Sequence, residues 1–430
     1  LGMVGRRVDS LRIFGRRRTE DSPRLWRRWA HAVMARPWVA LIGTVAVVGL
    51  LAFPARNLVL GSSGPSILPA DSTARQAADI TAGAFGAGAV SPIQMVYADP
   101  RGVTGDGLEG LLATVGAIAE DPDVVRVDFV LTPLLALNPG ATADEARQFL
   151  ASPLSADVRA QLVAADGDRT LVAIVTTHGP QTAESDATVE RLRALVPPVL
   201  PEGASAALGG SPGLNLDLND EVQRQIIPVV ALVMILSFVL LMLFFRSLLL
   251  PLKAILMNTA SVVAAYGVLV FVFQEGHWEG LLGFRSNGHI ESFLPLFLFS
   301  TLFGLSMDYE VFLLARVREE YLRTGDNTEA VGWGLEHTAR IITSAAAIMV
   351  TVFGAFAFAR LLPIKTMGFG LAVAVLLDAT LIRVIMVPAT MRLMGRWNWW
   401  LPKWLDRILP KVSVEESAPS PDEEKVAAPA

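Results

Sequence analysis

The stretch FGLSMDYEVFLLARVREEY, Phe303 to Tyr321, places three polar residues inside a long apolar run. Asp308, Tyr309 and Glu310 follow one another, and a basic segment begins at Arg316. About 20 apolar residues are enough for a helix to cross the hydrocarbon core of a bilayer. The stretch therefore predicts a membrane-spanning helix that carries a carboxylate inside it and ends in a basic anchor.

The composition of the whole chain agrees with a membrane protein. Of 430 residues, 52% are hydrophobic and 18% charged, and the mean hydropathy of +0.47 is too high for an ordinary soluble protein. The net charge of −5 offers no basic surface for nucleic acid. The absence of cysteine excludes disulfides, thiolate metal sites and cysteine nucleophiles.

Six segments are long and apolar enough to span a membrane, and all six are expected to be helices because lipid offers no hydrogen bonds to the backbone. Pro228 and Pro295 are expected near the starts of their helices, where a missing N–H costs little. The predicted spans are residues 37–55, 226–246, 251–273, 292–315, 341–360 and 366–391.

Basic residues flank one side of the predicted spans. Residues 1–36 hold ten Arg and three acidic residues, and further basic residues occur in the turn from Arg246 to Lys253, after span four and after span six. Since Lys and Arg accumulate in cytoplasmic loops, both termini are expected in the cytoplasm. Residues 57–222, with 21 acidic residues, eight Arg and no Lys, are then extracytoplasmic.

This extracytoplasmic region predicts an α+β domain. Residues 91–98, 124–131, 170–177 and 204–210 are strand candidates, and residues 106–121 and 186–196 have one apolar helical face. The order β-α-β followed by β-α-β predicts a split-βαβ, ferredoxin-like sheet. Residues 132–165 are expected to be a loop with one or two extra helices, and the Gly-rich segments 61–66 and 208–215 are expected to be hinges.

The predicted fold class is a polytopic α-helical membrane protein with an inserted extracytoplasmic α+β, porter-like domain. Because the chain begins with Leu, we expect a fragment of a larger protein. The expected divisions are a cytoplasmic basic segment (1–36), a first transmembrane helix (37–56), the porter-like domain (57–224), a five-helix bundle (225–395), a juxtamembrane segment (396–412) and a disordered acidic tail (413–430).

Asp308 is the first candidate functional residue. A charged Asp near the middle of a span costs roughly 2.5–3.5 kcal/mol, so such residues usually face a bundle interior and have a function. Burial favours the protonated carboxyl, which suits proton uptake and release, and Tyr309 adds a hydroxyl that donates or accepts. The alternative is that Asp308 only joins helices through a hydrogen bond. For Glu310, structural and functional roles remain equally open.

Asp378 and Arg383 form a second intramembrane pair, in the last span. Five residues separate them, which places them on different faces of an α-helix, so each is expected to reach a partner on another helix. Arg383 keeps its charge and is a candidate to hold a carboxylate, although a purely structural ion pair remains open. Milder polar residues such as Ser306 and Asn258 are typical of interhelical hydrogen bonds.

Several chemistries have no support in the sequence. No Walker A pattern occurs, and the five His residues show neither an HExxH motif nor a metal-ligand spacing. No nucleophile–base set is visible. We therefore expect no enzymatic activity, no cofactor and no bound metal.

Several motifs together resemble the MMPL family of the resistance–nodulation–division superfamily. GLSMDYEVFLLARVREEY is preceded by FFRSLLLPLKAILMN (244–258) and followed by LLDATLIRVIMVPATMRLMGRWNWWLP (376–402). RRWAHAVMARPWVALIG (27–43) and LPADSTARQA (68–77) match the opening of the family's second half. The resemblance covers nearly all of residues 1–410.

The resemblance implies a proton-driven exporter of lipids or other hydrophobic compounds in a bacterial inner membrane. Members have twelve spans in two repeated halves, and this chain resembles the C-terminal half. By resemblance, Asp308 and Tyr309 match a proton-relay pair, Asp378 and Arg383 match functionally important positions, and Ser306 is a supporting residue. The implied partners are a lipid or hydrophobic substrate, membrane lipids, and an N-terminal six-span half on the same or a partner chain.

Two other hypotheses remain open at the level of sequence. In the first hypothesis, the chain is a non-transporting scaffold or a sterol-sensing-like, lipid-binding module. In the second, a complete six-span protein works as a homodimer. Export by an Asp308→Asn variant distinguishes transport from scaffolding, because Asn cannot take up a proton.

Overall fold

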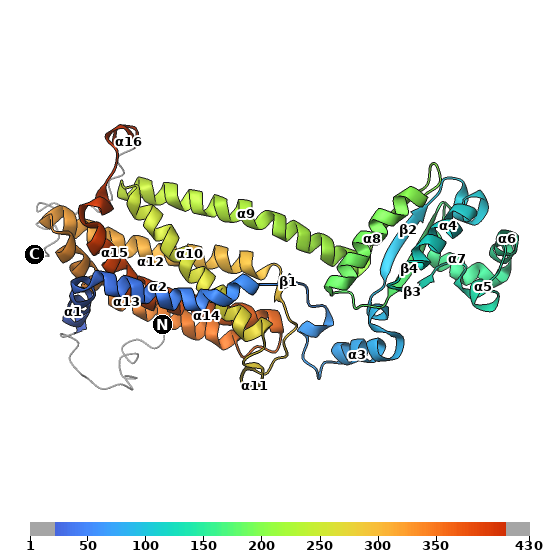
Figure 1. The fold of residues 1–430 in the computed structure, drawn as a ribbon, viewed down its shortest axis with the longest axis horizontal. Coiled ribbons are helices and arrows are strands. Elements are labelled where there is room, and N and C mark those ends of the chain that lie inside the picture. The colour runs from blue at the N-terminus through green and yellow to red at the C-terminus, as the bar shows by residue number, and fades with distance from the viewer. Residues whose placement is uncertain (1–21, 410–430) are drawn as a thin grey trace, which may run out of the picture.

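The computed structural model describes residues 22–409. The predicted acidic tail (413–430) and the first 21 residues of the predicted basic segment lie outside the described residues. Six helices are long and apolar enough to cross a membrane, as predicted, and they form one bundle (Figure 1). They are α2 (Pro37–Ala52, continued to Asn57), α9 (Gly210–Phe245), α10 (Leu249–Leu269, continued to Gln274), α12 (Leu294–Thr324), α13 (Asn327–Phe356) and α14 (Leu362–Leu377, continued through α15, Val387–Met394, to Trp399).

The helices differ in how far the bundle covers them. Along α10 and along the helix that contains α14, most of the apolar window is buried, whereas few residues of the apolar windows in α2 and α9 are buried. The exposed side chains of α9 are large and apolar, such as Ile227, Leu232 and Ile235. Without a bilayer such surface would be exposed to water, so these helices are suited to face lipid.

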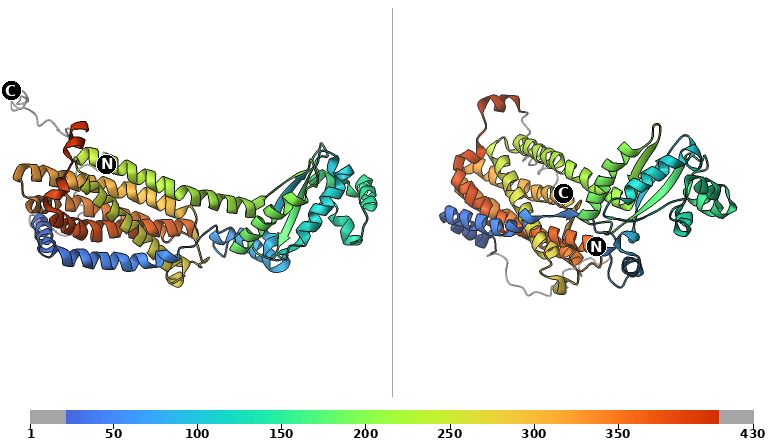
Figure 2. Two further views of the ribbon diagram at one scale, coloured as in Figure 1. Left: turned by 45° about the horizontal axis from the view of Figure 1, so that its top comes forward. Right: turned by 45° about the vertical axis from the view of Figure 1, so that its right-hand side comes forward.

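The α+β domain lies at one end of the elongated molecule, beyond the bundle (Figures 1 and 2). Its strands are β2 (Ile93–Ala98), β3 (Val124–Asp128), β4 (Arg169–Thr176) and β5 (Ser205–Gly209). All pair antiparallel in the order β3-β4-β2-β5, with α4 (Leu108–Ala119) after β2 and α8 (Ala183–Val199) after β4. This arrangement confirms the predicted ferredoxin-like α+β fold.

The sheet of this domain has one side covered by its own hydrophobic core. Burial alternates along β2, where Ile93, Met95 and Tyr97 are fully buried, as expected when one face of a strand packs and the other does not. These side chains pack with those of α4 and α8. The domain therefore has a core separate from that of the helix bundle.

Several short elements complete the structure. Three helices, rather than one or two, occupy the segment predicted to be a loop: α5 (Thr132–Leu137), α6 (Ala143–Ala151) and α7 (Ala156–Leu162). A small parallel pair, β1 (Leu60–Gly61) with β6 (Ile290–Glu291), joins the chain after α2 to the segment before α12. The remaining helices are α1 (Ser22–Ala35), α3 (Thr73–Phe85), α11 (Glu279–Leu282) and α16 (Lys403–Ile408).

Helix α9 corrects two expectations. It begins at Gly210, directly after β5, and continues for 36 residues, so the Gly-rich segment 208–215 forms the end of a strand and the start of a helix rather than a hinge. Pro228 consequently lies inside α9 instead of near its start, whereas Pro295 is in the first turn of α12 as expected. The domain is thus joined to the bundle by a continuous helix (Figure 1).

Candidate functional site

Helix α12 presents the three consecutive polar residues in three different environments. Successive side chains on an α-helix point about 100° apart, since 3.6 residues make one turn. Asp308 is exposed, Tyr309 is half-buried, and Glu310 is buried, with 4% of its surface accessible. The predicted pair Asp308–Tyr309 is therefore split between the outside and the inside of this bundle.

Asp308 lies on an open face of α12. The face is made by residues three or four positions apart, all exposed: Phe297, Ser300, Gly304, Asp308 and Phe312. A side chain added at Gly304 would meet no atom within 4 Å. Among residues 22–409, no side chain or backbone group forms a hydrogen bond or ion pair with the carboxylate of Asp308. The structure thus does not bring Asp308 together with the other predicted site residues.

The predicted residues Asp378 and Arg383 contact each other directly. The expectation of a partner on another helix is therefore wrong for Asp378, whereas Arg383 also reaches Ser306 on α12. One Nη of Arg383 donates to Oδ2 of Asp378 at 2.8 Å, and both side chains are buried. The reason is local backbone geometry: residues Asp378–Met386 are π-helical. In a π-helix the repeat is i to i+5, so residues five apart lie one above the other.

Arg383 also ties this pair to α12. The same nitrogen donates to the backbone oxygen of Ser306 at 2.9 Å and lies 3.4 Å from the Ser306 hydroxyl. The guanidinium carbon is 5.4 Å from the centre of the Tyr309 ring, and the Tyr309 hydroxyl is 3.6 Å from the sulfur of Met349. Tyr309, Ser306, Asp378 and Arg383 are therefore brought together, on the inside of the bundle.

A chain of hydrogen bonds continues from Ser306 to Glu310. The Ser306 hydroxyl donates to the side-chain oxygen of Asn258 on α10 at 2.8 Å, and the Asn258 amide donates to Oε2 of Glu310 at 3.1 Å. Arg383 and Lys253, another buried residue of α10, are close enough to Glu310 to act on its carboxyl group electrostatically. We call the set Asp378, Arg383, Ser306, Asn258 and Glu310 the internal polar chain.

The internal polar chain borders a small cavity of about 20 Å³, which is lined by Tyr309, Asp378 and Arg383 among others. That volume is sufficient for one water molecule, and polar walls favour one. No described residue bonds to three of the buried atoms nearby: Oε1 of Glu310, Oδ1 of Asp378 and Nζ of Lys253. Buried polar atoms without a partner are rare and costly in folded proteins, which makes this cluster a candidate functional site.

Sequence reasoning missed the roles of Lys253 and Glu310. The sequence places Lys253 in the basic turn on the cytoplasmic side, yet it is 8% exposed and lies inside α10. For Glu310 the sequence does not distinguish a structural from a functional role. The available signal was spacing: Ser306 and Glu310 are four residues apart and thus share a helix face, while Asp308 lies on another.

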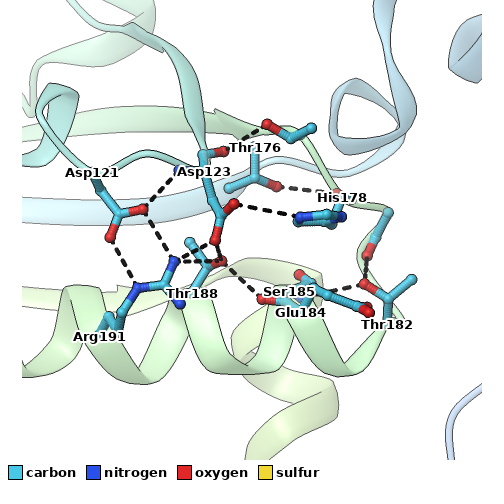
Figure 3. A network of polar contacts seen from close by, with 11 residues as sticks. Asp121, Asp123, Thr176, His178, Thr182, Glu184, Ser185, Thr188 and Arg191 are labelled. Atoms are coloured by element: carbon cyan, nitrogen blue, oxygen red, sulfur yellow. Dashed lines mark hydrogen bonds and ion pairs between the residues drawn. The ribbon is translucent and has the colours of Figure 1, made fainter.

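A second polar network lies in the α+β domain (Figure 3). Arg191 of α8 donates to Asp121 at 3.1 Å and to Asp123 at 2.5 Å, and His178 lies 3.4 Å from Asp123. The Arg191 guanidinium lowers the pKa of both carboxyl groups. Their contribution to stability is therefore present above the ordinary Asp pKa and is lost as the pH falls through the lowered values. The network holds the turn before β3 against α8 and therefore has a structural role.

Asp186 on α8 gives a pH-dependent prediction. Burial, then Asp220 and Glu190, raise its pKa from 3.8 to about 6, and no described residue bonds to its buried Oδ1. Because the folded pKa is the higher one, the native state loses stability as the pH rises from about 4 to about 6. We expect Asp186→Asn to stabilise α8 at pH 7.5 by about 1 kcal/mol, allowing for solvent screening, and to change nothing at pH 4.

Hydrogen exchange of the α8 amides measures this effect. The variant is expected to exchange about fivefold more slowly than the wild type at pH 7.5 and equally fast at pH 4. Asp157→Asn, at an exposed position of α7, is the control and should change neither rate. Equal exchange of wild type and Asp186→Asn at both pH values would contradict the assigned burial cost.

The sequence of this chain is similar to those of several known proteins. A model of the MMPL family matches residues 66–412. The mycolic acid-containing lipids exporter MmpL11 of Mycolicibacterium smegmatis is 36% identical over 418 residues, which cover 97% of this chain and 41% of that protein. The heme uptake protein MmpL11 of Mycobacterium tuberculosis is 36% identical over 411 residues, covering 95% and 39% respectively. The trehalose monomycolate exporter MmpL3 of M. smegmatis is 31% identical over 414 residues, covering 95% and 38%. The chain thus spans about two fifths of the length of these relatives.

Proposed function

We propose, because the chain belongs to the MMPL family of membrane transporters, that it forms the C-terminal, proton-coupled half of a lipid exporter. Family membership confirms the prediction of a multi-pass membrane transporter rather than an enzyme. The proposal concerns three points: proton coupling, the cargo and the second half of the transporter. Each point is supported by a separate observation.

The observation that carries the proposal is the unpartnered carboxylate of Asp308 on a membrane-spanning helix, between Ser306 and Glu310 of the internal polar chain. A carboxylate exposed to lipid costs several kcal/mol, and a chain retains such a group where it has a function. In the proposed cycle, the Asp308 carboxylate takes a proton from the extracytoplasmic side and releases it toward the cytoplasm. An electrical gradient of 100 mV supplies about 2.3 kcal/mol for each charge moved, enough to bias two packings of the helices.

The second half is proposed to pack against the open face of α12. Gly304 leaves room for close approach of another helix, and small residues are typical of contacts between membrane helices. The coverage of only two fifths of each relative supports a partner six-span unit, on the same or on a partner chain. In that contact Asp308 would leave the lipid and gain polar neighbours from the partner unit.

We further propose the predicted orientation, in a bacterial inner membrane. The ends of the spans that carry Arg246, Arg318, Arg323 and Arg392 lie away from the α+β domain, at the opposite end of the bundle (Figure 1). Positive residues favour the cytoplasmic side, so this end is assigned to the cytoplasm and the α+β domain to the outside. The proposed division of the chain remains 1–36, 37–56, 57–224, 225–395, 396–412 and 413–430.

The cargo is proposed to be a lipid or another amphiphile. Two of the relatives above are named exporters of mycolic acid-containing lipids and of trehalose monomycolate, and one is named a heme uptake protein. The large exposed apolar side chains of the bundle, such as Ile227 and Leu232, suit contact with the hydrocarbon part of such a molecule. Heme is the alternative cargo, and the experiment described next distinguishes it from lipid.

The experiment compares the source strain with a strain that lacks the gene. We expect the deletion to retain acetate-labelled lipids in the inner membrane, and we expect an uncoupler to produce the same retention in the wild type. Export that continues after the gradient collapses would overturn proton coupling. Unchanged surface lipids, together with lost growth on heme as the iron source, would replace lipid by heme as the cargo.

A further inference from the structure

A large cavity lies where the bundle meets the α+β domain, apart from the internal polar chain. Its volume is about 530 Å³, within the range of small-molecule sites. Three parts of the chain form its walls: the segment after α2 with α3, the loop after α11, and the connection from α13 to α14. It therefore lies at the end of the membrane-spanning helices, at the level of a membrane surface.

The charges around this cavity are strongly unbalanced. Its lining contains four cationic side chains, Arg75, Arg285, Arg360 and Lys365, and one acidic side chain, Asp79. Arg75 forms an ion pair with Asp79 at 2.9 Å, and Arg360 pairs with Asp71. The cavity thus has an excess of positive charge, which attracts an anion.

Some of the hydrogen-bond donors in the cavity are available to a ligand. Within residues 22–409, Arg285 makes no hydrogen bond or ion pair, and the buried Nδ2 of Asn287 has no acceptor. Lys365 is only 4% exposed and donates to the backbone oxygens of Leu282 and Gly283. An ammonium group has three donors, so one of those of Lys365 remains. A guanidinium, an amide and an ammonium together suit a phosphate group.

The apolar part of the lining indicates what carries the phosphate. Ile67, Leu68, Phe284 and Phe358 line the same cavity, and Phe358 is 77% exposed beyond it. Apolar wall beside a cationic end matches a molecule with a charged head and a hydrocarbon tail. A free phosphate would leave this apolar surface, and most of the volume, uncontacted.

We propose that this cavity binds the anionic headgroup of a membrane phospholipid, with the phosphate at Arg285, Asn287 and Lys365 and the acyl chains along Phe358. The assignment goes beyond the proposed export and does not depend on it, because the cavity and its charges belong to this chain alone. Failure of proton coupling would therefore leave the lipid site unaffected, and the reverse also holds.

Native mass spectrometry of the purified chain, in an uncharged detergent, tests the site. The probes are phosphatidylglycerol, which is anionic, and phosphatidylcholine with the same acyl chains, which is zwitterionic. We expect one phosphatidylglycerol to be retained in preference to phosphatidylcholine. Arg285→Gln and Asn287→Ala are each expected to weaken retention, Arg285→Gln by about tenfold, since a hydrogen bond to a charged group contributes a factor of that order.

The matched control is Arg56→Gln. Arg56 is an exposed arginine that follows α2, at the same end of the bundle, and it stacks on Phe53 outside the cavity. Its substitution should leave retention unchanged. Three outcomes would overturn the proposal: equal retention of the two lipids, displacement by millimolar inorganic phosphate, which would assign the site to a free anion, or unchanged retention in both cavity variants.

Discussion

Asp308→Asn is expected to reduce lipid export by roughly 100-fold or more, the range typical when a proton-transferring side chain is removed. Asn has nearly the same shape and can hydrogen-bond, but it cannot take up a proton. Because Asp308 is exposed and makes no bond within residues 22–409, the substitution leaves every described contact of the bundle in place. Folded protein should therefore reach the membrane in normal amounts without exporting lipid.

The control for this prediction is Glu319→Gln, on the same helix. Glu319 is exposed and pairs with Arg316 at 2.8 Å, at the basic end of α12. A surface pair of this kind contributes little, so export should stay near the wild-type level. If Asp308→Asn exported lipid as well as Glu319→Gln does, Asp308 would be a packing residue and the scaffold hypothesis would gain support.

Breaking the Asp378–Arg383 pair is expected to have the second-largest effect, on folding. Both side chains are buried, so Arg383→Met leaves the carboxylate without its ion-pair partner, and Asp378→Asn leaves the guanidinium without the carboxylate that it contacts. Removing one partner of a buried ion pair costs about 3–5 kcal/mol. Each single variant should therefore give little folded protein by size-exclusion chromatography.

The double variant Asp378→Asn, Arg383→Met separates folding from function. It removes both charges at once, so most of the folded yield should return, since a neutral pair of similar volume avoids the cost of burying charge. Export should remain lost if the internal polar chain is part of the proton path. A double variant that folds no better than either single variant would show that the two charges do not stabilise one another.

The spans and the sheet could be predicted because their signals are local. Long apolar runs identify six helices, and alternation along residues 91–98 identifies β2 with its buried Ile93, Met95 and Tyr97. The strand order then follows from the β-α-β repeat. None of these inferences requires knowledge of which residues meet across the fold.

The candidate site could be predicted only in part, because its geometry depends on departures from regular helices. Asp378 and Arg383 are five residues apart in the sequence, and their side chains become neighbours only because this segment is π-helical. Glu310 and Lys253 become buried through the packing of α10 against α12, which the sequence does not state. The sequence also does not indicate that α9 begins as early as Gly210, because the Gly and Pro residues there are typical of a hinge.

Proton flux through the protein shows directly whether the Asp308 carboxylate couples proton movement to transport. The gene product is reconstituted in sealed vesicles that contain a pH-sensitive dye, and a pH gradient is imposed with its lipid cargo present. We expect dye-reported proton movement with the wild type and with Glu319→Gln, and none above protein-free vesicles with Asp308→Asn. Equal proton movement with wild type and Asp308→Asn would contradict this expectation.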